Sequence, residues 1–125
     1  MVVTMKMQHE HVKKYFAAWK AYDTELLQSI FMPSAKYIIQ NKKRIYTGIQ
    51  EIVQYWKRNE KRQKDIQLSW KTIKSEPFCE TVDFLAEFWD IEECVFNKIT
   101  GFIVFKFNSE NKIEELSELY QKEVY

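Results

Sequence analysis

The hydrophobic residues of this 125-residue chain change their spacing part-way along the sequence. Near the N-terminus, Val12, Tyr15 and Trp19 are spaced three and four residues apart, as on one face of a helix. In the second half, apolar and polar residues alternate, as in residues 82–89, which is the spacing of a strand. Helices followed by strands predict an α+β fold, with a mostly antiparallel sheet covered on one side by helices.

The predicted elements follow one another without a flexible linker, so we expect a single domain over residues 1–125. Three helices are expected over residues 11–22, 24–31 and 49–63. Six strands are expected over residues 35–40, 45–46, 66–70, 82–89, 99–107 and 113–122. Pro33 is predicted to end the second helix, because proline and the residue before it do not continue a helix.

Composition argues against several classes of protein. A net charge of +1 gives no overall attraction to nucleic acid or to an anionic membrane, and the basic segment 57–64 suits the C-terminal end of a helix. The sequence contains neither an 18-residue apolar run nor an apolar leader, so we expect a cytoplasmic protein without membrane contact. Cys79 and Cys94 are not spaced as a metal-binding pair, and we expect neither a metal nor a cofactor.

His9 and His11 point to different faces of a helix, and solvation is expected for both.

Three segments carry motifs whose order and spacing are informative. They are YFAAWKAYD at residues 15–23, YTGIQEI at residues 46–52 and FKFNSENKI at residues 105–113. In this order they resemble the NTF2-like superfamily, in particular its SnoaL-like and ketosteroid-isomerase-like domains. The resemblance implies a cystatin-like cone, in which three N-terminal helices pack on a strongly curved, mostly antiparallel sheet around an apolar pocket. Asn111 stands where the family commonly has glycine, and asparagine is the next best residue for a left-handed backbone.

The resemblance also indicates which catalytic groups to look for. Ketosteroid isomerases of this fold use a tyrosine of the first helix, a carboxylate base on the first strand and a second acid on the penultimate strand. Tyr15 matches the tyrosine, but Ile39 and Ile103 stand at the two acid positions. The chain therefore lacks the full isomerase set. We also find no convincing match to the Asp and His of the family's cyclases and dehydratases, or to the Asp-Arg-Asp set of its epoxide hydrolases.

Strand parity predicts which side chains line the pocket, because alternate residues of a strand face the same side of the sheet. The predicted set combines helix residues with inward strand positions, and it is aromatic and aliphatic apart from one acid. Its members are Tyr15, Trp19, Tyr37, Ile39, Tyr55, Trp56, Trp70, Phe84, Phe88, Ile103, Phe105, Leu116, Glu118 and Tyr120.

Glu118 and Tyr15 are the candidate catalytic residues. A carboxylate among the apolar residues of the last two strands would lose its hydration, so its pKa should rise, which suits a general acid or base near neutral pH. Alternatively, Glu118 reaches water or pairs with Lys106 or Lys122. Tyr15 could donate to a ligand carbonyl, or it could be a core tyrosine with one internal hydrogen-bond partner.

The other face of the predicted sheet also carries large apolar residues. They are Leu85, Trp89, Phe102, Val104 and Leu119. A sheet that is apolar on both faces needs cover on both, and helices supply cover for only one. We therefore predict a homodimer with two-fold symmetry through this outer face, which is also a common arrangement in the family that the chain resembles.

Three functions remain open, in the following order of preference. The first is binding of a small hydrophobic molecule in an apolar pocket. The second is an enzyme, an isomerase, lyase or hydrolase, that uses Glu118 and Tyr15 on a small hydrophobic substrate. The third is a protein-interaction module. A fold of this type hosts all three, so the fold by itself does not choose between them.

Overall fold

The computed structural model describes residues 4–125, and within them three α-helices and six strands follow one another in the predicted order. The helices are α1 (Thr4–Ala21), α2 (Thr24–Ile30) and α3 (Ile49–Glu60). The strands are β1 (Phe31–Ile39), β2 (Arg44–Thr47), β3 (Gln63–Glu76), β4 (Cys79–Asp90), β5 (Val95–Phe107) and β6 (Ile113–Val124). A short 3-10 turn, η1 (Gln40–Lys42), joins β1 to β2.

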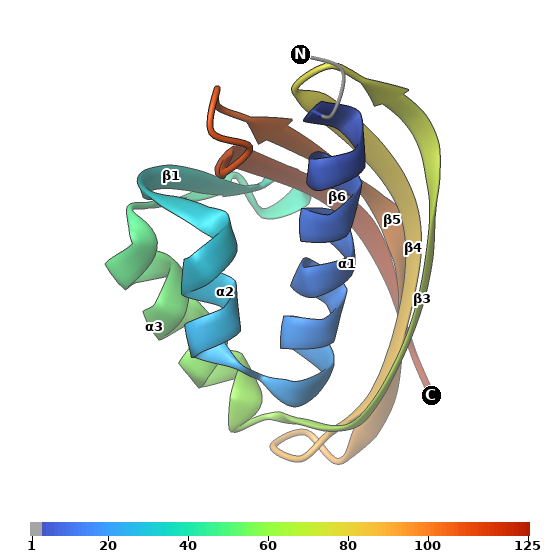
Figure 1. Cartoon of the computed structure of the whole chain (residues 1–125). Helices are drawn as coiled ribbons and strands as arrows, with labels where there is room; N and C mark the ends of the chain where they lie inside the picture. Colours follow the sequence, from blue (N-terminus) through green and yellow to red (C-terminus); the bar gives the residue numbers. More distant parts are fainter. Residues whose placement is uncertain (1–3) are drawn as a thin grey trace.

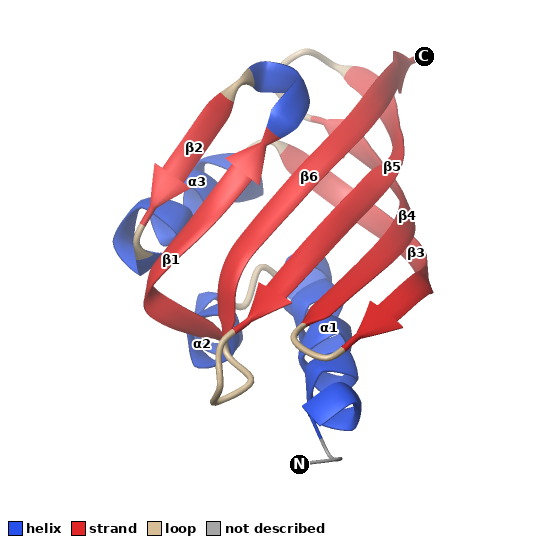
Figure 2. Cartoon of the chain, turned by 90° about the horizontal axis from the view of Figure 1, so that it is seen from above, coloured by secondary structure: helices blue, strands red, loops and turns tan. Residues whose placement is uncertain are grey.

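The six strands form one curved sheet in the order β2-β1-β6-β5-β4-β3, which can be followed in Figure 2. Neighbouring strands are antiparallel except β1 and β6, which run parallel. The helices lie on the concave side of this sheet, with α1 running along it (Figure 1). The α+β cone with a mostly antiparallel, strongly curved sheet is therefore confirmed.

Gly101 allows β5 and β6 to approach each other closely near the middle of the sheet. A Cβ atom at this position would lie 2.1 Å from the carbonyl oxygen of Leu119 and 2.7 Å from the Cα atom of Tyr120. Glycine inside a strand commonly marks such a close backbone approach. In the turn before β6, Asn111 has a φ of 64°, so the expected left-handed conformation is confirmed.

Helix α1 begins well before the predicted start at residue 11. Gln8 explains the difference, because its side chain is fully buried against the turn between β3 and β4. Its Nε2 donates to the carbonyl oxygen of Glu76 at 2.8 Å, and its Oε1 accepts from the backbone N–H of Phe78 at 3.0 Å. A buried amide that is bonded at both ends is not visible in the spacing of apolar residues.

Both histidines of α1 also make contacts outside the helix. His9 is 49% exposed, as expected for a solvated histidine, whereas His11 is half-buried. His9 Nδ1 lies 3.0 Å from a carboxylate oxygen of the fully buried Glu80. His11 Nδ1 bonds the backbone carbonyl of Asn111. Because these contacts join residues far apart in sequence, the helix pattern gave no sign of them.

Pro33 does not end the second helix as predicted. The helix stops at Ile30, and Pro33 lies inside β1. The pairing of β1 with β6 is irregular between Phe31 and Lys36, and proline is tolerated at such a bulge because it has no N–H to donate.

The core lies between the helices and the concave face of the sheet, and inward strand positions such as Ile39 and Ile103 are fully buried. On the outer face, Trp89, Phe102 and Leu119 are 40%, 49% and 52% exposed, and Leu85 and Val104 are half-buried. The homodimer through this face stays a prediction. None of the helices within residues 4–125 is long and apolar enough to cross a membrane.

Candidate functional site

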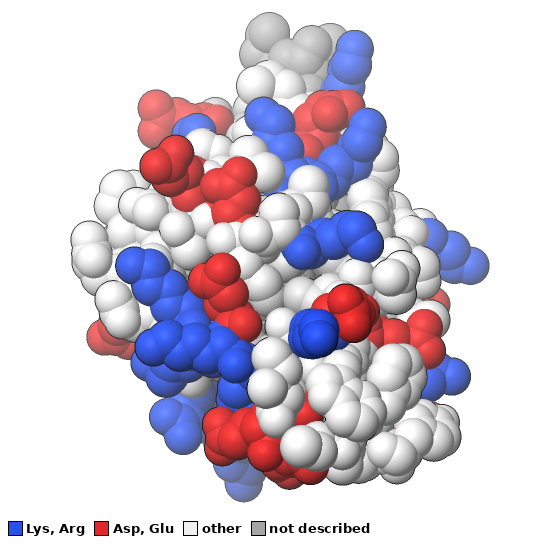
Figure 3. Space-filling model, turned by 90° about the horizontal axis from the view of Figure 1, so that it is seen from below, with Lys and Arg blue, Asp and Glu red and all other residues white. Residues whose placement is uncertain are grey.

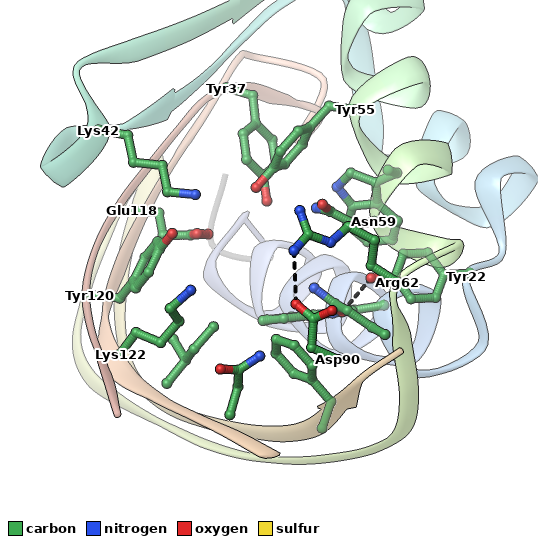
Figure 4. A pocket seen from close by; sticks show the side chains of 16 residues that line it. Tyr22, Tyr37, Lys42, Tyr55, Asn59, Arg62, Asp90, Glu118, Tyr120 and Lys122 are labelled. Carbon is green, nitrogen blue, oxygen red and sulfur yellow. Dashed lines mark hydrogen bonds and ion pairs between the residues drawn. The ribbon is translucent and has the colours of Figure 1, made fainter. Parts of the chain in front are cut away.

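A cavity of about 120 Å³ opens inside the cone, at the end where α1 and α3 finish and the turn between β4 and β5 lies (Figures 1 and 4). Its wall combines aromatic with polar side chains: Trp19, Tyr22, Tyr37, Lys42, Tyr55, Trp56, Asn59, Arg62, Gln63, Phe88, Asp90, Asn97, Ile99, Glu118, Tyr120 and Lys122. Figure 3 views the molecule from this end and shows both basic and acidic side chains gathered on it. The expected apolar pocket is thus aromatic on one part of its wall and polar on the rest.

The predicted pocket residues divide into two groups. Seven of them line the cavity: Trp19, Tyr37, Tyr55, Trp56, Phe88, Glu118 and Tyr120. The other seven lie in or against the core behind it: Tyr15, Ile39, Phe84, Ile103, Phe105 and Leu116 are buried, and Trp70 is half-buried. Aromatic packing fills this inner region; for example, the rings of Phe16 and Trp70 stack with their centroids 5.0 Å apart. A ligand in the cavity would contact the first group.

Glu118 is the acidic side chain that strand parity brings to the concave face of β6. It is 5% exposed, and its carboxyl group points into the cavity (Figure 4). Burial raises its pKa to about 7, although the positive charge of Lys42 and the Tyr37 hydroxyl act in the opposite direction. Within residues 4–125 its carboxyl group takes part in no ion pair. Lys106, one of the two expected partners, instead pairs with Glu115 at 3.4 Å.

The register of the sheet places Glu118 between the two isoleucines at the family's acid positions. On β1 its partner is Ile39, and on β5 its partner is Ile103. The carboxyl group that these two positions lack is therefore present on the strand between them. A single acid with a pKa near 7 can both accept and donate a proton at neutral pH.

A pair of tyrosines lies beside Glu118. The hydroxyl oxygens of Tyr15 and Tyr37 are 2.8 Å apart, and burial holds the pKa of both hydroxyls well above 10. In such a pair one hydroxyl donates and the other accepts, so the accepting tyrosine keeps its own proton for a further bond. Tyr37 lines the cavity and Tyr15 does not, so Tyr15 would act on a ligand only through Tyr37.

An ion pair closes the opposite wall. The guanidinium of Arg62 lies 2.9 Å from Asp90, whose other carboxylate oxygen accepts backbone N–H groups of Glu92 and Glu93 at 3.0 Å. Burial alone would raise the pKa of Asp90, but the Glu93 amide and the Arg62 guanidinium outweigh it and lower the pKa. Asp90 therefore stays ionised at neutral pH, with its charge balanced by Arg62.

Apart from Glu118 and the tyrosines, the sequence prediction missed the polar part of the wall. A signal existed for Lys122, since it lies two positions from the predicted inward Tyr120 on the same strand. Asn97 lies before residue 99, where its strand was predicted to begin. No signal existed for Arg62 or Lys42. They lie in segments read as a helix end and a turn, and the curvature of the sheet decides where those segments meet.

The site offers acid–base and hydrogen-bonding groups. No cluster of three or more histidine, cysteine, aspartate or glutamate residues that could hold a metal ion occurs in the described part of the chain. Asn97 is buried, and its Oδ1 has no hydrogen-bond partner among residues 4–125. Asn97 therefore gives the cavity wall a hydrogen-bond acceptor that the described residues do not use.

Comparison with known proteins shows the fold. No protein-family profile matches the sequence, and no curated protein matches it. Among solved structures, the enzyme SalBIII has a TM-score of 0.82 at 18% identity, with 96% of this chain and 97% of that chain covered. It is described as epoxide hydrolase/cyclase-like, with a role in forming the pyran ring of the polyether salinomycin.

Two further structures are similar over most of their length. A protein from Shewanella denitrificans OS-217, described as a SnoaL-like polyketide cyclase, has a TM-score of 0.81 at 13% identity, covering 91% of this chain and 90% of that chain. An NTF2-like protein from Burkholderia xenovorans LB400 has a TM-score of 0.78 at 12% identity, covering 95% and 92%. The chain therefore has the NTF2-like fold that its motifs resemble. At these identities the likeness carries the fold and not the activity.

Proposed function

We propose that this domain binds a small molecule of about one ring in the cavity, with a polar group of the ligand directed at Glu118. The observation that carries the proposal is the Glu118 carboxyl group, which is buried in the cavity wall and has no ion-pair partner within residues 4–125. An unpaired buried acid destabilises a fold, so its presence in a cavity is better explained by use than by packing.

The size and wall of the cavity fit this class of ligand. Its volume of about 120 Å³ is close to the roughly 150 Å³ of an apolar cavity that accepts benzene. Trp19, Tyr55 and Phe88 supply aromatic surface for a hydrophobic ring. The polar side chains would fix the orientation of the ligand, as they do in most small-molecule sites.

The test uses phenol as the probe and a variant that fills the cavity. Ile99→Phe adds volume at the wall, whereas Thr100→Phe adds the same group at the next residue, which faces the other side of the strand. Phenol should shift the backbone NMR signals of Tyr55 and Glu118 in the wild type and in Thr100→Phe, but not in Ile99→Phe. Equal shifts in all three proteins, or none at millimolar phenol, would overturn the proposal.

A second candidate function is catalysis by proton transfer, and the proximity of Glu118 and Tyr37 supports it. The Glu118 carboxylate would take a proton from the carbon next to a ligand carbonyl, and the bonding electrons would move to the carbonyl oxygen. Tyr37 would donate a hydrogen bond to that oxygen, with Tyr15 holding Tyr37 in place. Isomerases and lyases both begin with such a step. In this arrangement Tyr15 does not donate to the ligand carbonyl as expected, but acts indirectly by holding Tyr37.

Acetophenone in D2O tests this candidate. Deuterium should enter its methyl group faster with the protein than in buffer alone, and Glu118→Gln should abolish the difference. Tyr37→Phe should slow the exchange without abolishing it. Phenol binding together with exchange no faster than in buffer would refute catalysis and leave the binding function standing.

A further inference from the structure

Two lysines of the cavity wall have no acidic partner. Lys122 lies on β6, four residues after Glu118 and therefore on the same concave face, and its neighbour on β5 is the inward Ile99. Lys42 lies on η1, across the opening from α3. Neither ammonium group lies within 4.0 Å of a carboxylate among residues 4–125. Figure 4 shows both side chains directed toward the cavity beside Glu118.

The remaining charges of the wall do not cancel these two lysines. Arg62 and Asp90 neutralise each other, and Glu92 and Glu93, which also pair with Arg62, are not among the residues that line the cavity. Glu118 is then the other carboxyl group of the wall, facing two ammonium groups. A cavity lined by an excess of one charge raises the local concentration of ligands of the opposite charge.

We infer that the ligand of this cavity is a small organic anion, a one-ring carboxylate, whose charged group lies between Lys42 and Lys122 at the mouth. The inference rests on the proposed function, because it assigns a chemical class to the molecule bound there. The ring would lie on the aromatic wall beside Tyr120, which stands on β6 between Lys122 and the deeper Glu118. A polar substituent at the far end of the ligand would reach Glu118.

A cationic ligand is the competing class, since aromatic walls with a carboxylate can bind amines. The charges of the wall argue against it. Asp90 is already occupied by Arg62, and an amine at Glu118 would lie near Lys42, whose charge already acts on that carboxyl group. The amine therefore serves as one arm of the test.

The test compares three one-ring probes of nearly equal size, benzoate, benzamide and benzylamine, by calorimetric titration at pH 7 and low salt. Benzoate should bind the wild type at least ten-fold more tightly than benzamide, and benzylamine should bind most weakly. The double variant Lys42→Gln, Lys122→Gln should lose at least ten-fold in affinity for benzoate and keep its affinity for benzamide. The control, Lys43→Gln with Lys98→Gln, removes the same charge from residues outside the cavity wall and should bind benzoate like the wild type.

The outcomes distinguish failure of the anionic ligand class from failure of the proposed small-molecule binding. Benzamide or benzylamine binding as tightly as benzoate would overturn the anionic class while leaving a small-molecule site. An equal loss of benzoate affinity in the control would show a general effect of net charge and would also overturn the assignment. Failure of all three probes, together with failure of phenol, would overturn the proposed function and the inference with it.

Discussion

The buried carboxyl group of Glu118 should make the stability of the protein depend on pH in a direction opposite to that of most carboxylates. Burial raises its pKa from 4.5 to about 7 in the folded state, while the unfolded chain keeps the ordinary value. Between these pH values the folded protein holds a proton that the unfolded chain has released. The free energy of unfolding therefore falls as pH rises through this window.

The size of the effect follows from the two pKa values. At 1.36 kcal/mol per pKa unit, the difference between 4.5 and about 7 corresponds to about 3 kcal/mol. Glutamine has nearly the same shape as protonated glutamate and does not titrate. Glu118→Gln should therefore match the wild type near pH 4 and exceed its stability by about 3 kcal/mol at pH 8, which is of the order of 10 °C in Tm for a domain of this size.

Urea unfolding, followed by tryptophan fluorescence from pH 4 to pH 8.5, measures this difference directly. Other titrating groups cancel when the variant is subtracted from the wild type at each pH. Glu114→Gln is the matched control, because this residue is on the same strand and exposed, and its difference curve should be flat. A flat curve for Glu118→Gln as well would mean that the carboxyl group is hydrated in the folded state, and it would refute the reasoning behind both the raised pKa and the proton-transfer candidate.

Three further predictions concern the fold and its assembly. Tyr37→Phe leaves the buried hydroxyl of Tyr15 without its partner, so it should lower the free energy of unfolding by about 1–3 kcal/mol, and the double Phe variant should recover part of this loss in urea unfolding. If the double variant is no more stable than Tyr37→Phe, the bond between the hydroxyls is not the cause. Gly101→Ala would place a Cβ atom 2.1 Å from the Leu119 carbonyl oxygen and should cost about 2 kcal/mol in the same assay, whereas a loss below about 0.5 kcal/mol would show that the strands can separate. In sedimentation velocity the wild type should be a dimer and Phe102→Glu a monomer, and a monomeric wild type would contradict the outer-face interface.

The order of the elements and the inward strand positions could be predicted because both depend on local spacing. Ile39, Phe84 and Ile103 face the core, where alternation along each strand places them. Glu118 was identified in the same way, as the acid that shares a face with Leu116 and Tyr120. Alternation along a strand predicts these positions because a shift of one residue in the pairing register would turn every side chain of the strand to the wrong face.

The extent of the cavity could not be predicted, because it depends on which aromatic rings fill the cone. Phe16 and Phe84 pack with Trp70 and Trp19 in the inner part, so Trp70 packs against the core and does not line the cavity where it was expected. The spacing of apolar residues along the sequence predicts that a ring faces inward. It does not predict how far the neighbouring helix lies from that ring. The pairing of Arg62 with a buried acid is a tertiary contact of the same kind.

Because β1 pairs with β6, the cavity can form during synthesis of the chain only after β6 has been made. The bond from Gln40 to Ser117 joins residues 77 positions apart, and all of β2 to β5 lies between them. Contacts of such high separation form late, after loop closure has been overcome. Until β6 leaves the ribosome, β1 has an unpaired edge of the kind that promotes association between chains. The same strand brings Glu118 and Lys122, so the cavity wall and the protection of that edge are completed together, when β6 pairs with β1.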